Sequence, residues 1–535
     1  MFKKVLCLLK SHGVLFLIFT LASGLRLMWL TVPDSYTDEA VLALRSIGLM
    51  DYTGSYYQTT PWQWFEKIPW WARLSFHDHP LGFFVIEYFF IKLMGVSLWA
   101  VRLPSVIFGL GTVFLLYQWG KKIVSKKFGL IASGLLAVSS YHIWVSRLGI
   151  QDGAVTMMIV LLLCILGTVK EKPVHWYWWG MLFGLSLLLK YTALISFGFM
   201  LWYLVVYQYS AYRRHEFWGG MGLACLVTAP QWLYNFFLYR ARGHFDFQIS
   251  AALGQEVPEW SIRVGRELTG DIGLRIQNFF TALHDTTSPL FWMVVVFACA
   301  YAGYRAWGTD RLPRLLVGYT IIMSLWFLIL GSTYRFVVMI VPLLTMLITW
   351  TFYDIFLRNN QAYRWCMWTG LGFFMIMELL FSFNTFSLQP VGTVGKTYAA
   401  IRSEGEHYGF NALDRFLTER LKKEENIVII YDHDINFLAR LWVLDRHAWY
   451  GGVPLVAHDD ILKNFKDNLI SYQKKGIQSV LYVVTARSEV RKPIGERLGT
   501  AEVLVHQFIK EGSQVTDIHN RRGELVFRVY DFAIQ

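Results

Sequence analysis

Long apolar runs recur through the first 383 residues of the chain, and they constrain its fold more than any other feature of the sequence. A transmembrane helix needs about 20 mostly apolar residues. About eleven runs approach this length: residues 14–30, 102–119, 128–145, 154–169, 174–189, 191–209, 217–237, 289–304, 315–330, 336–356 and 365–383. Charged residues make up only 16% of the chain, against about 25% in soluble domains. The sequence therefore predicts an α-helical, polytopic membrane protein with about 11–13 spans.

The short loops rich in lysine and arginine orient these runs. Residues 121–127, 170–172, 213–215, 305–314 and 358–364 fall after alternate runs. Short cytoplasmic loops carry an excess of basic residues. Residues 401–535 hold equal numbers of basic and acidic residues, so the net charge of +12 comes from the membrane part. Without a basic stripe on a soluble surface, we expect no nucleic-acid partner.

The first apolar run follows Lys3, Lys4 and Lys10 and reads as a membrane anchor. A cleaved signal peptide is the alternative, because residues 22–24 are small enough to be a cleavage site. In either case the loop that follows is exported. We therefore expect a bacterial-type inner (plasma) membrane protein whose first loop faces outward.

Composition divides the chain into a membrane domain at 1–385, a linker at 386–404 and a soluble α/β domain at 405–535 outside the membrane. The first outer loop covers about 32–100, and its helix at 81–94 is too short and too polar to span. In the soluble domain, apolar spacing predicts strands at 426–431, 479–484 and 524–530 and helices at 410–422 and 460–473. The five cysteines show no metal-ligand spacing.

The orientation brings ionisable side chains from several outer turns to one membrane face, where such groups are costly and indicate function. The first outer loop and its edge contribute Asp38, Glu39, His77, Asp78, His79 and Arg102. Three further outer turns contribute Arg147, Gln151, Asp152, Lys190, Tyr334 and Arg335.

This mixture suits a displacement that releases a lipid phosphate. Guanidinium groups match phosphate oxygens in a fork geometry. A nearby carboxylate can deprotonate an incoming hydroxyl. Cations that stabilise charge growing on the phosphate often supply the largest catalytic contribution.

Each of these residues also has a purely structural interpretation. Asp38 and Glu39 could start a surface helix, where acids suit the helix dipole. Arg102, Arg335 and Lys190 could anchor their helices at the interface. Arg147 and Asp152 could form an ion pair that closes a turn. The histidines of the first loop more often order a loop than bind a metal.

Several motifs, taken in order, resemble the GT-C membrane glycosyltransferases. The motifs are Asp38-Glu39 after the first span, His79-Pro80-Leu81, Arg102-Leu103-Pro104-Ser105, residues 146–152, Leu189-Lys190-Tyr191 and Tyr334-Arg335-Phe336. The resemblance covers roughly residues 15–356 and is closest to the dolichyl-phosphate-mannose protein mannosyltransferases and the lipid A aminoarabinose transferases.

The resemblance implies transfer of a sugar from a polyprenyl-phosphate donor, usually with inversion, on the outer face. Asp38 resembles the catalytic carboxylate of the family, with Glu39 beside it in the site. Arg102 resembles the arginine that faces the carrier phosphate, and Tyr334 and Arg335 resemble the late outer loop that approaches it. With Lys190 these form the expected donor-phosphate site. His77, Asp78, His79, Arg147, Gln151 and Asp152 are expected to line the substrate site.

The chain departs from the family at two points. It has one proline in Asp78-His79-Pro80-Leu81 where many relatives have two, and only His244 loosely represents a histidine that can help hold metal in one branch. A divalent metal is therefore left open. The acceptor could be a protein, lipid A or another envelope glycan. A flippase for lipid-linked sugars, a polysaccharide ligase or polymerase, and an inert anchor for the terminal domain are the competing functions.

Overall fold

A computed structural model describes residues 2–35, 37–52, 58–260, 271–308, 310–331, 334–358, 361–386, 408–424, 426–432, 435, 440–457, 465–486 and 513–534. The chain divides into two compact units. The first unit contains Met1–Leu30 and Leu49–Ile401, and the second contains Thr31–Gly48 and Arg402–Gln535. The segment that carries Asp38 and Glu39 thus groups with the C-terminal residues.

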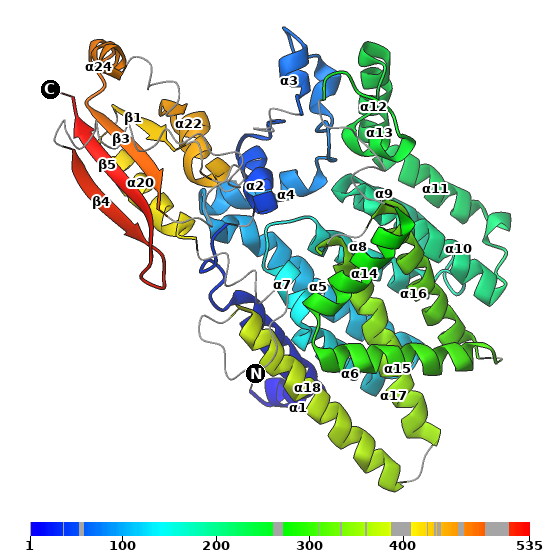
Figure 1. Cartoon of the computed structure of the whole chain (residues 1–535). Coiled ribbons are helices and arrows are strands. Elements are labelled where there is room, and N and C mark those ends of the chain that lie inside the picture. The colour runs from blue at the N-terminus through cyan, green and yellow to red at the C-terminus, as the bar shows by residue number, and fades with distance from the viewer. Residues whose placement is uncertain are drawn as a thin grey trace. The chain divides into compact units, whose positions relative to one another are not determined.

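The first unit is helical (Figure 1). Its α-helices are α1 (Phe2–Leu27), α3 (Pro61–Trp64), α4 (Gly82–Met94), α5 (Leu98–Ile123), α6 (Lys126–Val138), α7 (Ser140–Ser146), α8 (Asp152–Leu166), α9 (His175–Leu189), α10 (Ile195–Tyr207), α11 (His215–Val227), α12 (Ala229–Arg242), α13 (Phe247–Leu253), α14 (Ile272–Thr286), α15 (Pro289–Ala306), α16 (Arg311–Leu330), α17 (Val341–Arg358) and α18 (Gln361–Phe386). Its short 3₁₀ helices are η1 (Trp70–Arg73), η2 (Tyr191–Leu194), η3 (Ala211–Arg213) and η5 (Phe336–Ile340).

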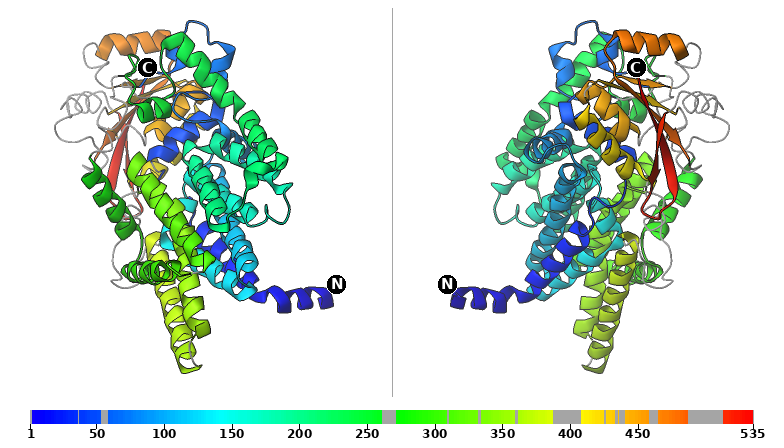
Figure 2. Two further views of the ribbon diagram at one scale, coloured as in Figure 1. Left: turned by 90° about the vertical axis from the view of Figure 1, so that its right-hand side faces the viewer. Right: turned by 90° about the vertical axis from the view of Figure 1, so that its left-hand side faces the viewer.

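Five helices in the described part of the chain are long and apolar enough to cross a membrane. They are Leu98–Ile123, Pro289–Ala306, Arg311–Leu330, Phe336–Arg358 and Arg364–Asn384. The bent pair α6 and α7 would make a sixth, and Gly13–Leu27, Asp152–Leu166 and Tyr191–Tyr207 are shorter apolar helices. Figure 2 shows α17 and α18 side by side in yellow-green. The expected membrane helices are thus present, although fewer reach spanning length than the eleven apolar runs.

Two runs that were expected to form single helices are each divided into two helices. The run at 217–237 divides at Thr228 into α11 and α12, because Pro230 lacks an N–H and is tolerated only in the first turn of a helix. The run at 128–145 bends by 66° between α6 and α7 at Ser139, whose backbone is extended. Periodicity detects apolar residues but not the break between two short helices.

Glycines let α9 and α11 approach until their backbones touch. A Cβ atom at Gly180 would lie 1.8 Å from the carbonyl oxygen of Gly220. A Cβ atom at Gly220 would lie 2.2 Å from the carbonyl oxygen of Trp176. Small residues at such crossings are a general feature of helix packing in membranes.

The second unit contains a five-stranded mixed sheet in the order β2-β1-β3-β5-β4. Its strands are β1 (Ile427–Tyr431), β2 (Leu455–Ala457), β3 (Ser479–Thr485), β4 (Gln514–His519) and β5 (Leu525–Ala533). Strand β1 is parallel to β2 and β3, whereas β5 is antiparallel to β3 and β4. Every residue of the central strand β3 is buried, as expected for a strand covered on both faces.

Helices complete the second unit: α2 (Thr37–Gly48), α20 (Phe410–Lys423), the π-helical turn η6 (Leu441–Asp445), α22 (Arg446–Gly451) and α24 (Phe465–Lys474). Phe410, Leu413 and Leu417 form the buried side of α20, and the ring of Phe410 packs against Phe527 of β5. The α/β class and the expected strands are confirmed. The expected linker lies almost wholly outside the described residues, as does the first part of the helix expected at 460–473.

We predict that Gly180→Ala lowers the free energy of unfolding by about 1–3 kcal/mol, because the added methyl group forces two backbones apart. Gly222→Ala in α11 is the matched control, since a Cβ atom there meets nothing within 4 Å. Thermal unfolding of the purified protein in detergent measures both. An unchanged midpoint for Gly180→Ala would contradict the close crossing.

Candidate functional site

Two buried arginines hold the carbonyl groups at the end of α1. Carbonyl groups in the last turn of a helix have no partner within the helix. Arg147 donates from Nη1 and Nη2 to four of them, those of Leu25 (3.0 Å), Arg26 (3.1 Å), Met28 (2.7 Å) and Trp29 (3.0 Å). Arg102 donates to the carbonyl of Leu30 at 2.7 Å. These bonds fix the backbone at the end of α1.

Arg147 and Asp152 were considered as an ion pair that closes their turn, and each is seen with other partners. The carboxylate of Asp152 pairs instead with Lys190, while Arg147 binds helix carbonyls. Burial, with the charges of Arg102 and Arg26, lowers the pKa of Arg147 to about 9. Three guanidinium groups therefore share a region poor in water, which favours an anion in their vicinity.

Lys190 forms a buried ion pair in the turn after α9. Its Nζ lies 2.7 Å from Oδ1 of Asp152 at the start of α8 and 3.9 Å from the centroid of the Phe336 ring. Arg335 lies over the same ring, with its guanidinium carbon 5.2 Å from the centroid. Three separate turns therefore meet here: Asp152 pairs with Lys190, and Lys190 and Arg335 share the ring of Phe336. This gathering was expected from the sequence.

Tyr334 and Gln151 complete this part of the site. The Tyr334 hydroxyl donates to Asp285 at 3.1 Å, and its carbonyl accepts a hydrogen bond from the hydroxyl of Tyr141. Gln151 is buried, and its side-chain nitrogen has no hydrogen-bond partner among the described residues. Such a donor is available to a ligand.

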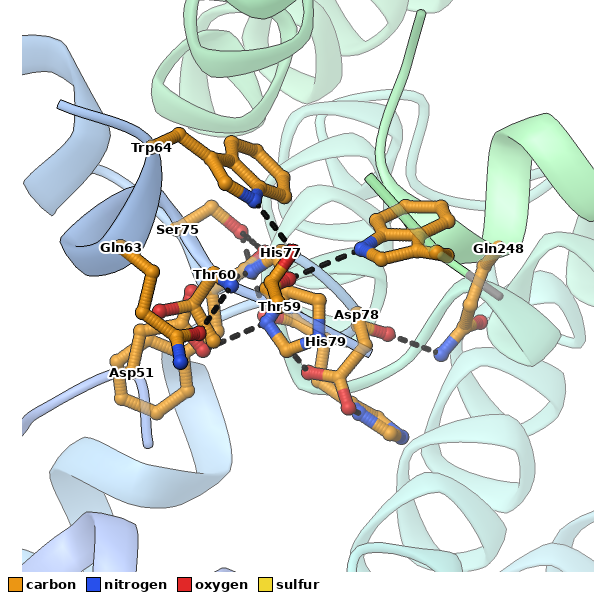
Figure 3. A network of polar contacts seen from close by, with 12 residues as sticks. Asp51, Thr59, Thr60, Gln63, Trp64, Ser75, His77, Asp78, His79 and Gln248 are labelled. Carbon is orange, nitrogen blue, oxygen red and sulfur yellow. Dashed lines mark hydrogen bonds and ion pairs between the residues drawn. The ribbon is translucent and has the colours of Figure 1, made fainter. Parts of the chain in front are cut away.

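A second cluster is centred on His77, which is completely buried (Figure 3). Asp51 accepts hydrogen bonds from the backbone N–H of His77 at 2.9 Å and contacts its Nδ1 at 2.8 Å. His79 Nδ1 lies 3.2 Å from Asp78. The contacts of His77 fit the expectation that these histidines order the loop, and they identify Asp51, which the sequence analysis missed.

Three of these residues could also hold a metal ion. One ligand atom from each of Asp51, His77 and Asp78 lies within 4.8 Å of the others. If Nδ1 of His77 donates to Asp51, its Nε2 is left for a metal, an arrangement common around metal-binding histidines. His244 is instead directed to Glu259, with its Nε2 3.3 Å from that carboxylate.

Hydrogen bonds fasten the loop that contains His77 to the segment at 243–260. The backbone N–H of Phe247 donates to the carbonyl of His77 at 2.7 Å, and Gln248 donates to the carbonyl of Asp78 at 2.7 Å. The indole of Trp260 donates to the carbonyl of Thr59 at 2.9 Å. These bonds order the loop that contains His77, Asp78 and His79.

Asp246 ties the same segment to the turn that contains Lys190. Its carboxylate accepts hydrogen bonds from Tyr191, from Asn235 (2.8 Å), from Gln231 (3.2 Å) and from the backbone of Ile249 (2.9 Å). Burial raises the pKa of Asp246, and the hydrogen bond from Tyr191 is the largest opposing effect. Sequence reasoning missed this residue, although an aspartate three residues before the N–H it caps is a recognisable helix start.

Asp38 and Glu39 lie in the first turn of α2, in the second unit. Glu39 is completely buried and Asp38 is partly buried. Acids are favoured in this turn by the helix dipole, as the structural interpretation expected. The other candidate residues from the sequence lie in the first unit.

An apolar cavity of about 600 Å³ opens in the first unit. It is lined by Arg73, Leu74, Leu81, Gly82, Val85, Ile86, Phe108, Met158, Leu182, Leu185, Leu188, Leu189 and Pro230. Arg73 is the single charged residue in this lining. In sequence, the lining residue Leu189 directly precedes Lys190, and the lining residue Leu81 follows Pro80 in the loop of His79.

By fold, the chain resembles two structures of ArnT from Cupriavidus metallidurans. One is bound to undecaprenyl phosphate and has a TM-score of 0.55, with 11% identity over 97% of this chain and 98% of ArnT. The other is the apo state, with a TM-score of 0.57 and 12% identity over 98% of each chain. The fold is therefore that of the GT-C class of helical membrane proteins.

Sequence comparison points to the same class. A family model described as dolichyl-phosphate-mannose-protein mannosyltransferase matches residues 78–234. YycA of Bacillus subtilis (strain 168), whose name assigns it provisionally to the mannosyltransferases, is 27% identical over 143 residues. The match covers 26% of this chain and 21% of that relative. Together these findings confirm the resemblance to the GT-C membrane proteins that was seen in the sequence.

We predict that Lys190→Met and Asp152→Asn each lower the free energy of unfolding by about 3–5 kcal/mol. Each substitution removes one charge of the pair and leaves the charge of the other residue buried. The double variant should lose less than the sum of the two, since neither charge remains. Thermal unfolding in detergent measures this cycle. Additive losses would show that the ion pair does not couple the two turns.

Proposed function

We propose that the chain transfers a sugar from a polyprenyl-phosphate donor to an acceptor of the cell envelope on the outer face of the membrane. The acceptor supplies a hydroxyl or amine carried by a protein, a lipid or a glycan. The membrane is of the bacterial plasma-membrane type, and the C-terminal α/β domain lies outside it. The fold shared with ArnT, which was solved with undecaprenyl phosphate, supports the choice of donor.

The observation that carries this proposal is the apolar cavity with a cation, Arg73, in its lining. A polyprenyl chain is apolar and its phosphate is anionic, so a site for it needs an apolar surface that ends in cations. The cavity supplies the surface, Arg73 lies in its lining, and Lys190 follows its wall residue Leu189. Arg335 shares the Phe336 ring with Lys190.

In the proposed reaction, the acceptor oxygen or nitrogen attacks the anomeric carbon of the sugar. The bond from that carbon to the phosphate oxygen breaks on the opposite side, so the configuration inverts. Asp38 takes the proton that the acceptor loses, and Glu39 supports the site beside it. Both electrons of the broken bond remain on the lipid phosphate, whose added charge is stabilised by Arg102 with Lys190 or Arg335.

The remaining polar residues have supporting roles in this proposal. Tyr334 holds the late outer turn by its bond to Asp285. The buried amide of Gln151 is available to a sugar hydroxyl. His77, Asp78 and His79 form an ordered wall, while Arg147 and Asp152 hold the polar turns in place.

Replacing Asp38 by asparagine tests the assigned base. Asp38→Asn should abolish sugar transfer, because the amide cannot accept the acceptor proton, and the protein should stay folded because the two side chains have nearly the same shape. Transfer of a radiolabelled sugar from a polyprenyl-phosphate donor measures activity, and thermal unfolding checks the fold. Wild-type activity in this variant would remove Asp38 as the base.

Filling the cavity tests the donor site. Val85 lines the cavity, whereas Phe89 lies one turn further along α4, is exposed and is absent from the lining. Val85→Trp should raise the Kd for undecaprenyl phosphate at least tenfold by occupying its space, and Phe89→Trp should leave the Kd unchanged. Quenching of intrinsic fluorescence during titration measures both. Equal effects of the two variants would place the lipid elsewhere.

A further inference from the structure

The α/β domain and the segment after α1 exchange hydrogen bonds across the length of the sequence. Helix α20 begins after Gly409, which has no side chain to cap it and takes a positive φ of 88°. Asp34 supplies the cap instead. Its carboxylate accepts from the backbone N–H groups of Gly409 and Asn411, each at 2.8 Å. A carboxylate at this position satisfies orphan donors and suits the helix dipole.

The side chain of Asn411 also contacts the segment that precedes Asp34. Its Nδ2 donates toward three successive carbonyl oxygens, those of Thr31 (3.2 Å), Val32 (3.4 Å) and Pro33 (3.1 Å). The segment that leads into α2 is therefore held by its side chain at Asp34 and by its backbone at residues 31–33. Asp34 itself is buried.

Tyr450 holds the other end of α2. Its hydroxyl donates to the carbonyl of Leu44 at 2.7 Å. A Cβ atom at Gly48, the last residue of α2, would lie 2.9 Å from the Tyr450 ring. The tyrosine thus occupies the space beside the C-terminal turn, and it supplies a donor to a carbonyl of that turn.

Asn411 and Tyr450, the two residues that contact α2 and the segment before it, lie on helices that are tied to each other. Arg446 of α22 pairs with Asp414 of α20 at 2.5 Å, which ties the elements that carry Tyr450 and Asn411. Arg420 of α20 pairs with Asp531 of β5 at 3.0 Å. Helix α2 packs against η6, and its residues from Ala40 to Ser46 that face inward are buried. The sheet thus supports α2 through α20, η6 and α22.

We propose that the C-terminal α/β domain positions the acid pair, with Asn411 and Tyr450 as positioning residues that fix α2 at its two ends. This inference rests on the proposed function, in which Asp38 is the base. Asp38 lies between the two attachment points, four residues after Asp34 and six before Leu44. A shift of about 1 Å in a catalytic group can cost about 100-fold in rate, so small side chains far from the chemistry can control it.

The test compares the double variant Asn411→Ala/Tyr450→Phe with the control Glu419→Ala/Trp449→Phe, which changes exposed side chains on the same two helices. The double variant should lower kcat about 100-fold and leave KM for the polyprenyl-phosphate donor within twofold. Its amides in α2 should exchange hydrogen faster, while those of β3 should not. The control should match the wild-type protein in all three measurements.

An unchanged kcat, or a lower kcat without faster exchange in α2, would overturn the positioning role. If the double variant fails to fold, Tyr450→Phe alone removes one hydroxyl, and it should still lower kcat and speed exchange near Leu44. Asp38→Asn, assayed in parallel, separates the two proposals. If Asp38→Asn is active, Asp38 is not the base. If Asp38→Asn is inactive but the double variant is fully active, only the positioning role is contradicted.

Discussion

The carbonyl groups at the end of α1 need donors in a place where burial excludes water, and Arg147 and Arg102 provide them. Five hydrogen bonds from these two side chains fix the backbone from Leu25 to Leu30. A helix end buried without such partners would be costly. The same bonds hold the two guanidinium groups of Arg102 and Arg147 in place.

Several turns of the first unit are connected to one another through buried polar contacts. Lys190 joins the turn after α9 to the start of α8, and Asp246 joins the next residue, Tyr191, to α12 and to the segment at 243–260. That segment in turn binds the loop of His77. Each of these bonds lies away from water, where a hydrogen bond between charged and polar groups is strong and an unpaired group is costly. The polar side chains are therefore held in place before any substrate binds.

The sequence predicted those parts of the structure that depend on local pattern. The apolar runs predicted helices. β-Branched runs predicted β1 and β3, and alternation of apolar and polar residues predicted β5, within a few residues. Lys190 and Arg335 were expected to meet because loops on one side of a membrane converge, and they share Phe336. Partners remote in the chain could not be predicted: no local signal pairs Asp51 with His77, or Asp34 with Asn411. The role of Arg147 also depended on tertiary contacts, since the same side chain could bind a carboxylate or a row of carbonyls.

The attachment of α2 to residues 409–450 has a consequence for biosynthesis. Domains fold largely in the order in which they leave the ribosome. The helix with Asp38 and Glu39 is translated among the first 48 residues, but Gly409, Asn411 and Tyr450 arrive more than 360 residues later. A nascent chain has the acids long before it has the groups that hold them. Residues made later thus supply the contacts that hold residues made earlier, and a chain truncated before residue 409 has the acids without those contacts.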